Sequence, residues 1–148
     1  MLRRYWKKRS SRGLIYLDSN IFLYPALYDL KTVKKAAKAA TLLQRVVEGR
    51  LEASTSVLTW DEVVWGVRKL LGKDVATHPG RSFLSLPNLK LLSFDFEMLL
   101  KAQEIVEKYS VKPRDAVHAA TAVRNKIVEV VSHDPDLEAV SEIKRTEP

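Results

Sequence analysis

Residues 14–20 read LIYLDSN, a short apolar run that ends in an aspartate, and this stretch decides the fold. Such a run is typical of a short buried strand, and Ser19 or Asn20 can then cap a following helix by accepting a backbone hydrogen bond. The stretch IVEVVSHDPD at 127–136 repeats the pattern, with Asp134 just beyond its apolar run. Open parallel sheets bind ligands beyond the carboxyl ends of their strands. We therefore expect Asp18 and Asp134 to meet at one edge of a parallel sheet.

The rest of the chain alternates between strand and helix patterns. The expected elements are, in chain order, a strand at 14–17, a helix after it, a helix at 32–48, a short strand at 51–53, a helix capped by Ser54, Thr55 or Ser56 and ending at Leu71, a loop over 72–87 with one short helix at most, a strand at 90–94, a helix at 96–109, a helix from Pro113, a strand at 127–131 and an edge strand near Arg145. Strands separated by helices imply right-handed crossovers and a sheet covered on both faces. The sequence predicts an α/β fold, a three-layer α/β/α sandwich with a mostly parallel sheet of four or five strands.

Length and composition limit the function classes. The chain has 148 residues, 46% of them apolar, and no cysteine, which fits one domain over residues 13–148 and removes disulfides, thiolate nucleophiles and Cys-based zinc sites. No apolar run reaches the roughly 18 residues of a membrane-spanning helix. Neither a signal peptide nor a Gly-rich nucleotide-binding loop is evident. We expect a cytoplasmic protein with no membrane partner.

The net charge of +7 is concentrated at the start of the chain. Residues 1–12 hold six basic side chains and no acid, so the other 136 residues carry 19 basic and 18 acidic side chains, a net charge of +1. A basic extension of this kind can bind phosphates through counterion release. It can equally be a solvated, disordered extension, and both interpretations stay open.

Four acidic residues from four separate segments carry the functional hypothesis: Asp18, Glu62, Asp115 and Asp134. Each has a structural explanation when taken alone, as a helix cap, a favourable charge at a helix N-terminus or a turn former. Periodicity does not choose cleanly between Glu62 and its neighbour Asp61. Gathered together, however, carboxylates repel one another unless a cation neutralises them, and Mg²⁺ or Mn²⁺ suits such oxygen ligands. The four acids therefore suggest a metal site.

The order of four motifs resembles that of the PIN-domain family, and most closely its VapC-type toxin ribonucleases. The motifs are LIYLDSNIFLY, TSVLTWDEV, VKPRDAVHAATA and VVSHDPDLEAV, and together they span about residues 14–147. The resemblance implies that Asp18, Glu62, Asp115 and Asp134 are the metal-binding acids, that Asn20 is the polar residue after the first acid, and that Asp136 is a further acid of the last loop. It also implies a Mg²⁺- or Mn²⁺-dependent endoribonuclease, a small antitoxin as partner, and a homodimer.

The predicted chemistry is hydrolysis of phosphodiester bonds in single-stranded or looped RNA by metal-activated water. Asn20 or Ser132 would orient a carboxylate, and Lys112 or Arg114 would position the RNA backbone. His118, one turn after Asp115, is interpreted as a structural hydrogen-bonding residue. Two alternatives stay open: a catalytically degenerate module that binds RNA or protein, and a housekeeping RNA-processing nuclease.

Overall fold

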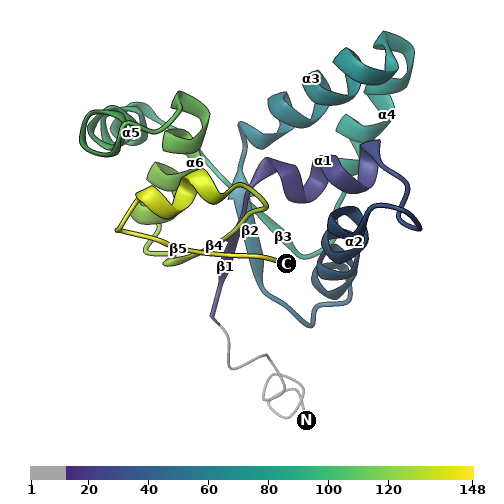
Figure 1. Ribbon diagram of the computed structural model, residues 1–148, viewed down its shortest axis with the longest axis horizontal. Helices are drawn as coiled ribbons and strands as arrows, with labels where there is room; N and C mark the ends of the chain where they lie inside the picture. The colour runs from purple at the N-terminus through teal and green to yellow at the C-terminus, as the bar shows by residue number, and fades with distance from the viewer. Residues whose placement is uncertain (1–12) are drawn as a thin grey trace.

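The computed structural model describes residues 13–148 (Figure 1), and the basic segment 1–12 lies outside the described residues. Five parallel strands form one sheet in the order β3-β2-β1-β4-β5. The strands are β1 (Ile15–Leu17), β2 (Ala53–Ser56), β3 (Leu89–Leu92), β4 (Glu129–Val131) and β5 (Lys144–Thr146). The predicted α/β class and parallel sheet are confirmed, and the edge strand expected near Arg145 is β5.

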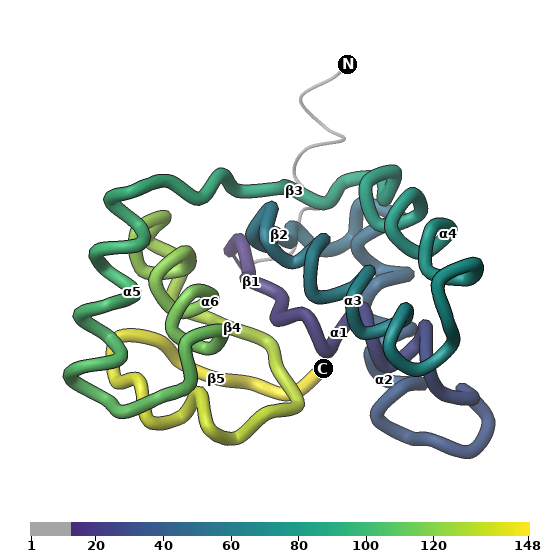
Figure 2. The backbone as a smooth tube through the Cα atoms, turned by 90° about the horizontal axis from the view of Figure 1, so that it is seen from above, coloured from purple at the N-terminus to yellow at the C-terminus, as the bar shows by residue number. Residues whose placement is uncertain are grey.

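Helices cover both faces of the sheet, as Figure 1 and the view from above in Figure 2 show. One side carries α1 (Ser19–Leu27), α2 (Lys34–Val47), α3 (Thr59–Leu71) and α4 (Lys73–Leu84), and the other carries α5 (Phe96–Tyr109), α6 (Pro113–Arg124) and the 3₁₀ helix η3 (Pro135–Ala139). Among residues 13–148, no helix is both long and apolar enough to cross a bilayer.

The central strand β1 supplies side chains to both layers. Successive strand residues point to opposite faces, so Ile15 and Leu17 join the core beneath α1 to α4, while Tyr16 joins the core beneath α5 and α6. All three are fully buried. A strand with both faces buried explains why residues 14–17 form a continuous apolar run rather than an alternating one.

The strand predicted at 51–53 lies instead at Ala53–Ser56. Ser54, Thr55 and Ser56, which were expected to cap the next helix, belong to this strand, β2. Ser54 Oγ donates to the Ile15 carbonyl (3.0 Å), and Thr55 Oγ1 donates to the Leu17 carbonyl (2.7 Å). Thr55 Oγ1 also lies 2.7 Å from Thr59 Oγ1. These bonds satisfy the buried hydroxyls, so a polar strand can lie inside the sheet, between β3 and β1.

The segment 72–87 was expected to be a loop with one short helix at most, but Lys73–Leu84 form the 12-residue helix α4, so the prediction of a mainly irregular segment is wrong. Pro79 and Gly80 lie inside this helix, and both residues argued against it in the sequence. Packing explains the glycine: a Cβ at Gly80 would lie 2.8 Å from Val64 Cγ2 and 3.2 Å from Trp60 Nε1. Gly80 therefore allows α4 to pack closely against α3.

The helix expected at 96–109 has the predicted bounds, but the apolar stripe that its spacing predicts, Leu99, Leu100, Ala102, Ile105 and Val106, is only partly buried. Ala102 and Ile105 are buried, whereas Leu99 and Leu100 are 52% and 46% exposed. The apolar spacing in α2 points to Ala36, Ala37, Ala40 and Leu43 as its packing face, and Ala36 is buried as expected, but the other buried residues are Ala39, Leu42 and Val46. Periodicity located both helices but placed their buried faces less well, because the neighbouring elements decide which side is covered.

Replacing Thr55 by valine tests the importance of the polar bonds in β2. Thr55→Val keeps the shape but leaves the Leu17 carbonyl and the Thr59 hydroxyl without this partner, so we expect a loss of about 1–3 kcal/mol in the free energy of unfolding. The matched control is Thr41→Val on α2, where an exposed hydroxyl bonds the Ala37 carbonyl and the expected change is within about 0.5 kcal/mol. Urea denaturation measures both, and equal effects would contradict the interpretation.

Candidate active site

The register of the sheet brings the two predicted strand-end motifs together. Leu17 of β1 pairs with Val131 of β4, and the Asp18 backbone N–H donates to the Val131 carbonyl (3.0 Å). Asp18 and Ser132 therefore leave the sheet side by side. Asp18 also caps α1, since its Oδ1 accepts from the Ser19 backbone N–H (2.7 Å). The expected caps, Ser19 and Asn20, do not perform that role.

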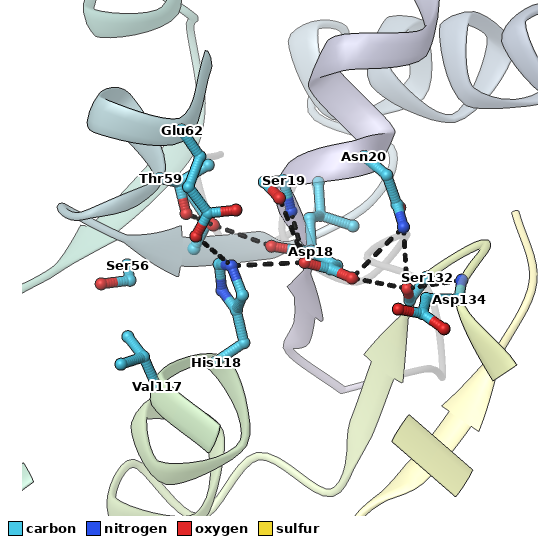
Figure 3. Close-up of polar contacts among 12 residues, drawn as sticks. Asp18, Ser19, Asn20, Ser56, Thr59, Glu62, Val117, His118, Ser132 and Asp134 are labelled. Atoms are coloured by element: carbon cyan, nitrogen blue, oxygen red, sulfur yellow. Dashed lines mark hydrogen bonds and ion pairs between the residues drawn. The ribbon is translucent and has the colours of Figure 1, made fainter. Parts of the chain in front are cut away.

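Asn20 and Ser132 hold the buried Asp18 carboxylate in place (Figure 3). Ser132 Oγ donates to Asp18 Oδ2 (2.6 Å), and Asn20 Nδ2 donates to the same oxygen (3.3 Å) and to Ser132 Oγ (3.1 Å). Ser132 Oγ also accepts from the Asp134 backbone N–H (2.9 Å). The contacts expected of Asn20 and Ser132 are present, and they link β1 to the loop after β4.

Glu62 approaches the same cluster from the first turn of α3. Its Oε1 lies 2.8 Å from His118 Nε2, which is also 3.3 Å from Asp18 Oδ1. Figure 3 shows the imidazole between the two carboxylates. Asp61, the alternative that periodicity left open, is exposed, whereas Glu62 is partly buried. The geometry favours Glu62 as the member of the cluster.

The other acids form a second group, at the start of α6 and in the loop after β4. Asp115, Asp134 and Asp136 each offer a carboxylate oxygen, and these oxygens lie within 4.8 Å of one another. Asp134 also shapes its own loop, because its Oδ1 accepts from the Asp136 backbone N–H (2.9 Å). Asp136 is exposed, and one of its oxygens lies 3.6 Å from Lys112 Nζ.

One cleft of about 490 Å³ is lined by all four predicted metal-binding acids together with both predicted RNA-contacting residues. Its lining comprises Asp18, Ser19, Asn20, Glu62, Lys112, Pro113, Arg114, Asp115 and Asp134. These residues come from the ends of β1 and β4 and from the first turns of α1, α3 and α6. The fold thus collects distant segments at the carboxyl edge of the sheet.

The electrostatics of the cleft differ from one acid to the next. Burial, reinforced by the charges of Asp134 and Asp18, raises the pKa of Asp115 from 3.8 to about 6. Burial alone would also raise the pKa of Glu62, but His118, Ser19 and Arg114 outweigh it, and the pKa is lowered. Burial disfavours a charged His118, but Tyr16 and the two carboxylates outweigh it and hold its pKa above its usual value.

The donor set fits a divalent cation bound by oxygen atoms. Asp115 Oδ2 is buried and has no hydrogen-bond partner in the described part of the chain, and an unpaired buried carboxylate oxygen is costly unless a cation or proton meets it. The raised pKa of Asp115 has a related origin, because burial and, after it, the charges of Asp134 and Asp18 disfavour its ionised form. Mg²⁺ and Mn²⁺ prefer such oxygen ligands.

The sequence did not indicate the part played by Tyr16. Its hydroxyl lies 2.6 Å from His118 Nδ1 and accepts from the Ser56 backbone N–H (3.1 Å). His118 was expected to be a structural hydrogen-bonding residue, and it is one, although its partners include two of the predicted site acids. The only signal for this was its place one turn after Asp115, which puts both residues on one side of α6.

Comparison with known families identifies the family to which this fold belongs. The sequence profile of the PIN domain matches residues 15–143. This chain belongs to the PIN-domain family. A search among curated proteins finds no match. The family predicted from the four motifs is therefore confirmed, and its acidic cluster is a candidate active site.

Solved structures similar to this PIN domain include VapC and VapBC proteins. VapBC2 from Rickettsia felis, bound to a DNA fragment from its promoter, has a TM-score of 0.69 at 16% identity, covering 91% of this chain and 98% of that chain. Mycobacterium tuberculosis VapC20, a sarcin–ricin loop cleaving toxin, has a TM-score of 0.71 at 14% identity, covering 90% and 99%. FitAcB from Neisseria gonorrhoeae has a TM-score of 0.63 at 20% identity, covering 88% and 95%. At these identities the likeness establishes the fold.

The raised pKa of Asp115 predicts how the stability of the metal-free protein depends on pH. A carboxyl group with a pKa of about 6 when folded and 3.8 when unfolded contributes no penalty below pH 3.8, and it costs stability increasingly as the pH rises towards 6. Asp115→Asn should therefore be more stable than the unsubstituted protein at pH 8, with an advantage that shrinks as the pH falls from about 6 to 4.

Thermal unfolding in the presence of a chelator measures this difference between the two proteins. Titrating groups distant from Asp115 cancel in the comparison, whereas Asp18 and Asp134, whose charges couple to Asp115, are relieved by the substitution and add to the advantage at high pH. An advantage that is absent at pH 8, or that grows as the pH falls, would contradict the raised pKa.

Proposed function

We propose that this PIN domain is a Mg²⁺- or Mn²⁺-dependent endoribonuclease that hydrolyses phosphodiester bonds in single-stranded or looped RNA. The observation that carries the proposal is the convergence of Asp18, Glu62, Asp115 and Asp134 on one cleft, with Asp115 Oδ2 buried and unpaired among the residues described. Four carboxylates without a cation would repel one another in a partly buried site. Membership of the PIN-domain family supports the same chemistry.

Each group in the cleft has a task under this proposal. The four acids hold the cation, which when bound neutralises charge at the phosphate and makes water more acidic. Asn20 and Ser132 keep the Asp18 carboxylate in one orientation through the bonds to Oδ2. Asp136 lies beside Asp134 and pairs with Lys112 at the rim. Because Asp136 is exposed, its proposed task is to add negative charge near the cation and not to bind it directly.

Lys112 and Arg114 are the proposed contacts to the RNA backbone. Both are exposed residues at the start of α6 and both line the cleft. Arg114 is close enough to Glu62 to lower the pKa of that carboxyl, so a phosphate bound by Arg114 would lie next to the acids. A guanidinium is well suited to bind a phosphate through two hydrogen bonds.

We further propose that the protein acts as the toxin of a toxin–antitoxin pair in the cytoplasm, inhibited by a small antitoxin protein, and that it forms a homodimer. The antitoxin partner is supported by the similar structures, which include a toxin–antitoxin complex from Klebsiella pneumoniae and the DNA-bound VapBC of Salmonella typhimurium. The cytoplasmic location and the homodimer rest on the resemblance to VapC-type toxins. Co-expression with the product of an adjacent small gene, followed by co-purification, tests the partner.

A cleavage assay with matched acidic substitutions tests the nuclease. Purified protein and labelled single-stranded RNA are incubated with Mg²⁺ or Mn²⁺, with and without a chelator. Glu62→Gln should lower the cleavage rate by about 100-fold or more, since even residues that only support a metal ligand typically contribute about 10- to 100-fold. Asp61→Asn, which alters an exposed carboxylate one residue earlier, should cleave at the unsubstituted rate. Asp18→Asn and Asp115→Asn should behave like Glu62→Gln.

Two outcomes of this assay would overturn the proposal. Cleavage that survives the chelator and all three site substitutions would come from other residues or from a contaminant. RNA binding without cleavage, unaffected by the same substitutions, would favour a binding module.

Arg114→Ala tests the proposed contact to RNA separately from the chemistry. Loss of one phosphate contact should weaken RNA binding and reduce the slope of log K against log salt concentration by about 0.7. Arg124→Ala removes an exposed arginine from the other end of α6 and should leave both quantities unchanged. Fluorescence anisotropy with labelled RNA over a range of salt concentrations measures them, and equal effects of the two substitutions would contradict a specific role for Arg114.

A further inference from the structure

His118 is a buried histidine whose two ring nitrogens both have partners. It lies on α6 and is 1% exposed. On one side, Nδ1 is 2.6 Å from the hydroxyl oxygen of Tyr16. On the other, Nε2 is 2.8 Å from Glu62 Oε1 and 3.3 Å from Asp18 Oδ1. Nε2 could therefore present either a hydrogen to the carboxylates or a lone pair to a cation.

The lone-pair alternative has support in the geometry. Asp18, Glu62 and His118 can each offer one ligand atom, and these atoms lie within 4.8 Å of one another. A site that included an imidazole nitrogen would accept zinc and other transition metals readily. Whether His118 is a ligand therefore decides what kind of metal centre the cleft holds.

The hydroxyl of Tyr16 decides whether His118 Nε2 carries a hydrogen or a lone pair. Tyr16 is fully buried, and its oxygen accepts a hydrogen bond from the Ser56 backbone N–H (3.1 Å). Its own hydrogen needs a separate acceptor, and among residues 13–148 the bonded acceptor is His118 Nδ1. If Nδ1 carried the hydrogen instead, the Tyr16 hydrogen would be buried and unpaired, an arrangement that proteins avoid. Nε2 would then also direct a lone pair at Glu62 Oε1.

We infer that His118 is a positioning residue and not a metal ligand: Nε2 keeps its hydrogen and donates it to Glu62. The bonds run from the Ser56 N–H to Tyr16, from the Tyr16 O–H to His118, and from the His118 Nε2–H to Glu62, so the backbone of β2 fixes the orientation of a carboxylate on α3. These bond directions are those of the neutral ring. In the charged ring Nδ1 also carries a hydrogen and directs it at the Tyr16 oxygen, but Nε2 still donates to Glu62, so the position of the Nε2 hydrogen is the same in both states.

This inference extends the proposed function by leaving a centre made of oxygen ligands only, which Mg²⁺ and Mn²⁺ prefer. An outer partner of this kind orients the ligand and limits its motion. The effect of His118 on cation binding rests on the proposed function, whereas the position of the Nε2 hydrogen is a property of the metal-free protein. The two can therefore be tested separately.

Nitrogen-15 NMR of the full chain labelled at histidine tests the hydrogen position directly. The chain has three histidines, and His118→Gln identifies the resonances of His118. We expect Nε2 of His118 to be protonated without metal and to remain so when Mg²⁺ is added. Tyr16→Phe should shift the Nδ1 resonance, because that nitrogen loses its donor. A deprotonated Nε2 in either state overturns the assignment, whether or not the protein cleaves RNA.

Two substitutions of different length test the positioning role. The amide nitrogen of Gln can occupy about the place of Nε2, and that of Asn about the place of Nδ1, so only His118→Gln can still donate to Glu62. We expect His118→Asn to weaken Mn²⁺ binding by about 10- to 100-fold, and His118→Gln to restore most of that loss. Binding is measured by the electron paramagnetic resonance of free Mn²⁺, and His78→Gln, at an exposed position of α4, is the control.

The outcomes separate positioning from mere packing. Equal losses of Mn²⁺ affinity in the Gln and Asn variants, or no loss in either, overturn the positioning role. If the unsubstituted protein binds no Mn²⁺, the proposed function fails, and the NMR result still decides whether Nε2 carries its hydrogen. If the Asn variant does not fold, His118→Gln and Tyr16→Phe are compared with the unsubstituted protein, and full Mn²⁺ affinity in Tyr16→Phe overturns the role.

Discussion

The parallel pairing of β1 with β4 is the constraint on which the site depends. Because Leu17 pairs with Val131, the residues that follow these strands emerge at the same level, and Ser132 reaches Asp18 at 2.6 Å. A shift of one residue would reverse every side chain of β1 between the two cores. Ile15 and Leu17 are buried on one face and Tyr16 on the other, so burial fixes the register. The geometry of the carboxylates is thus a consequence of core packing.

The same strand carries the interior part of the polar network. Tyr16 contributes its ring to the core beneath α6, and its hydroxyl reaches both β2 and His118. Apolar packing holds the ring, so the hydroxyl and the imidazole are held as well. Asp18, the N-cap of α1, lies two residues after Tyr16. Its carboxylate is oriented by Ser19, Asn20 and Ser132. The proposed metal ligands therefore depend on residues that are themselves rigidly packed, which favours a preformed site.

The local sequence was informative where the pattern is strong and short-range. The apolar runs before Asp18 and Asp134, the helix over 96–109 and the Pro113 start of α6 were all predicted from it. It failed where tertiary contacts outweigh local preference. Ser54 and Thr55 of β2 resemble helix caps until their bonds to the β1 carbonyls are known. Helix α4 contains Pro79 and Gly80, and its packing against α3 uses the missing side chain of the glycine.

The sequence by itself determined the α/β class and the PIN-domain family and named candidate acids, because alternation of strands and helices and the order of motifs are properties of the chain. Tertiary structure alone decided that Glu62 and not Asp61 reaches the cluster, that Asp115 has an unpaired buried oxygen, and that Tyr16 and His118 connect β2 to Glu62. These facts depend on the distances between residues 40 to 102 positions apart in the chain. Such distances follow from how α3 and α6 pack on the sheet, which no local pattern encodes.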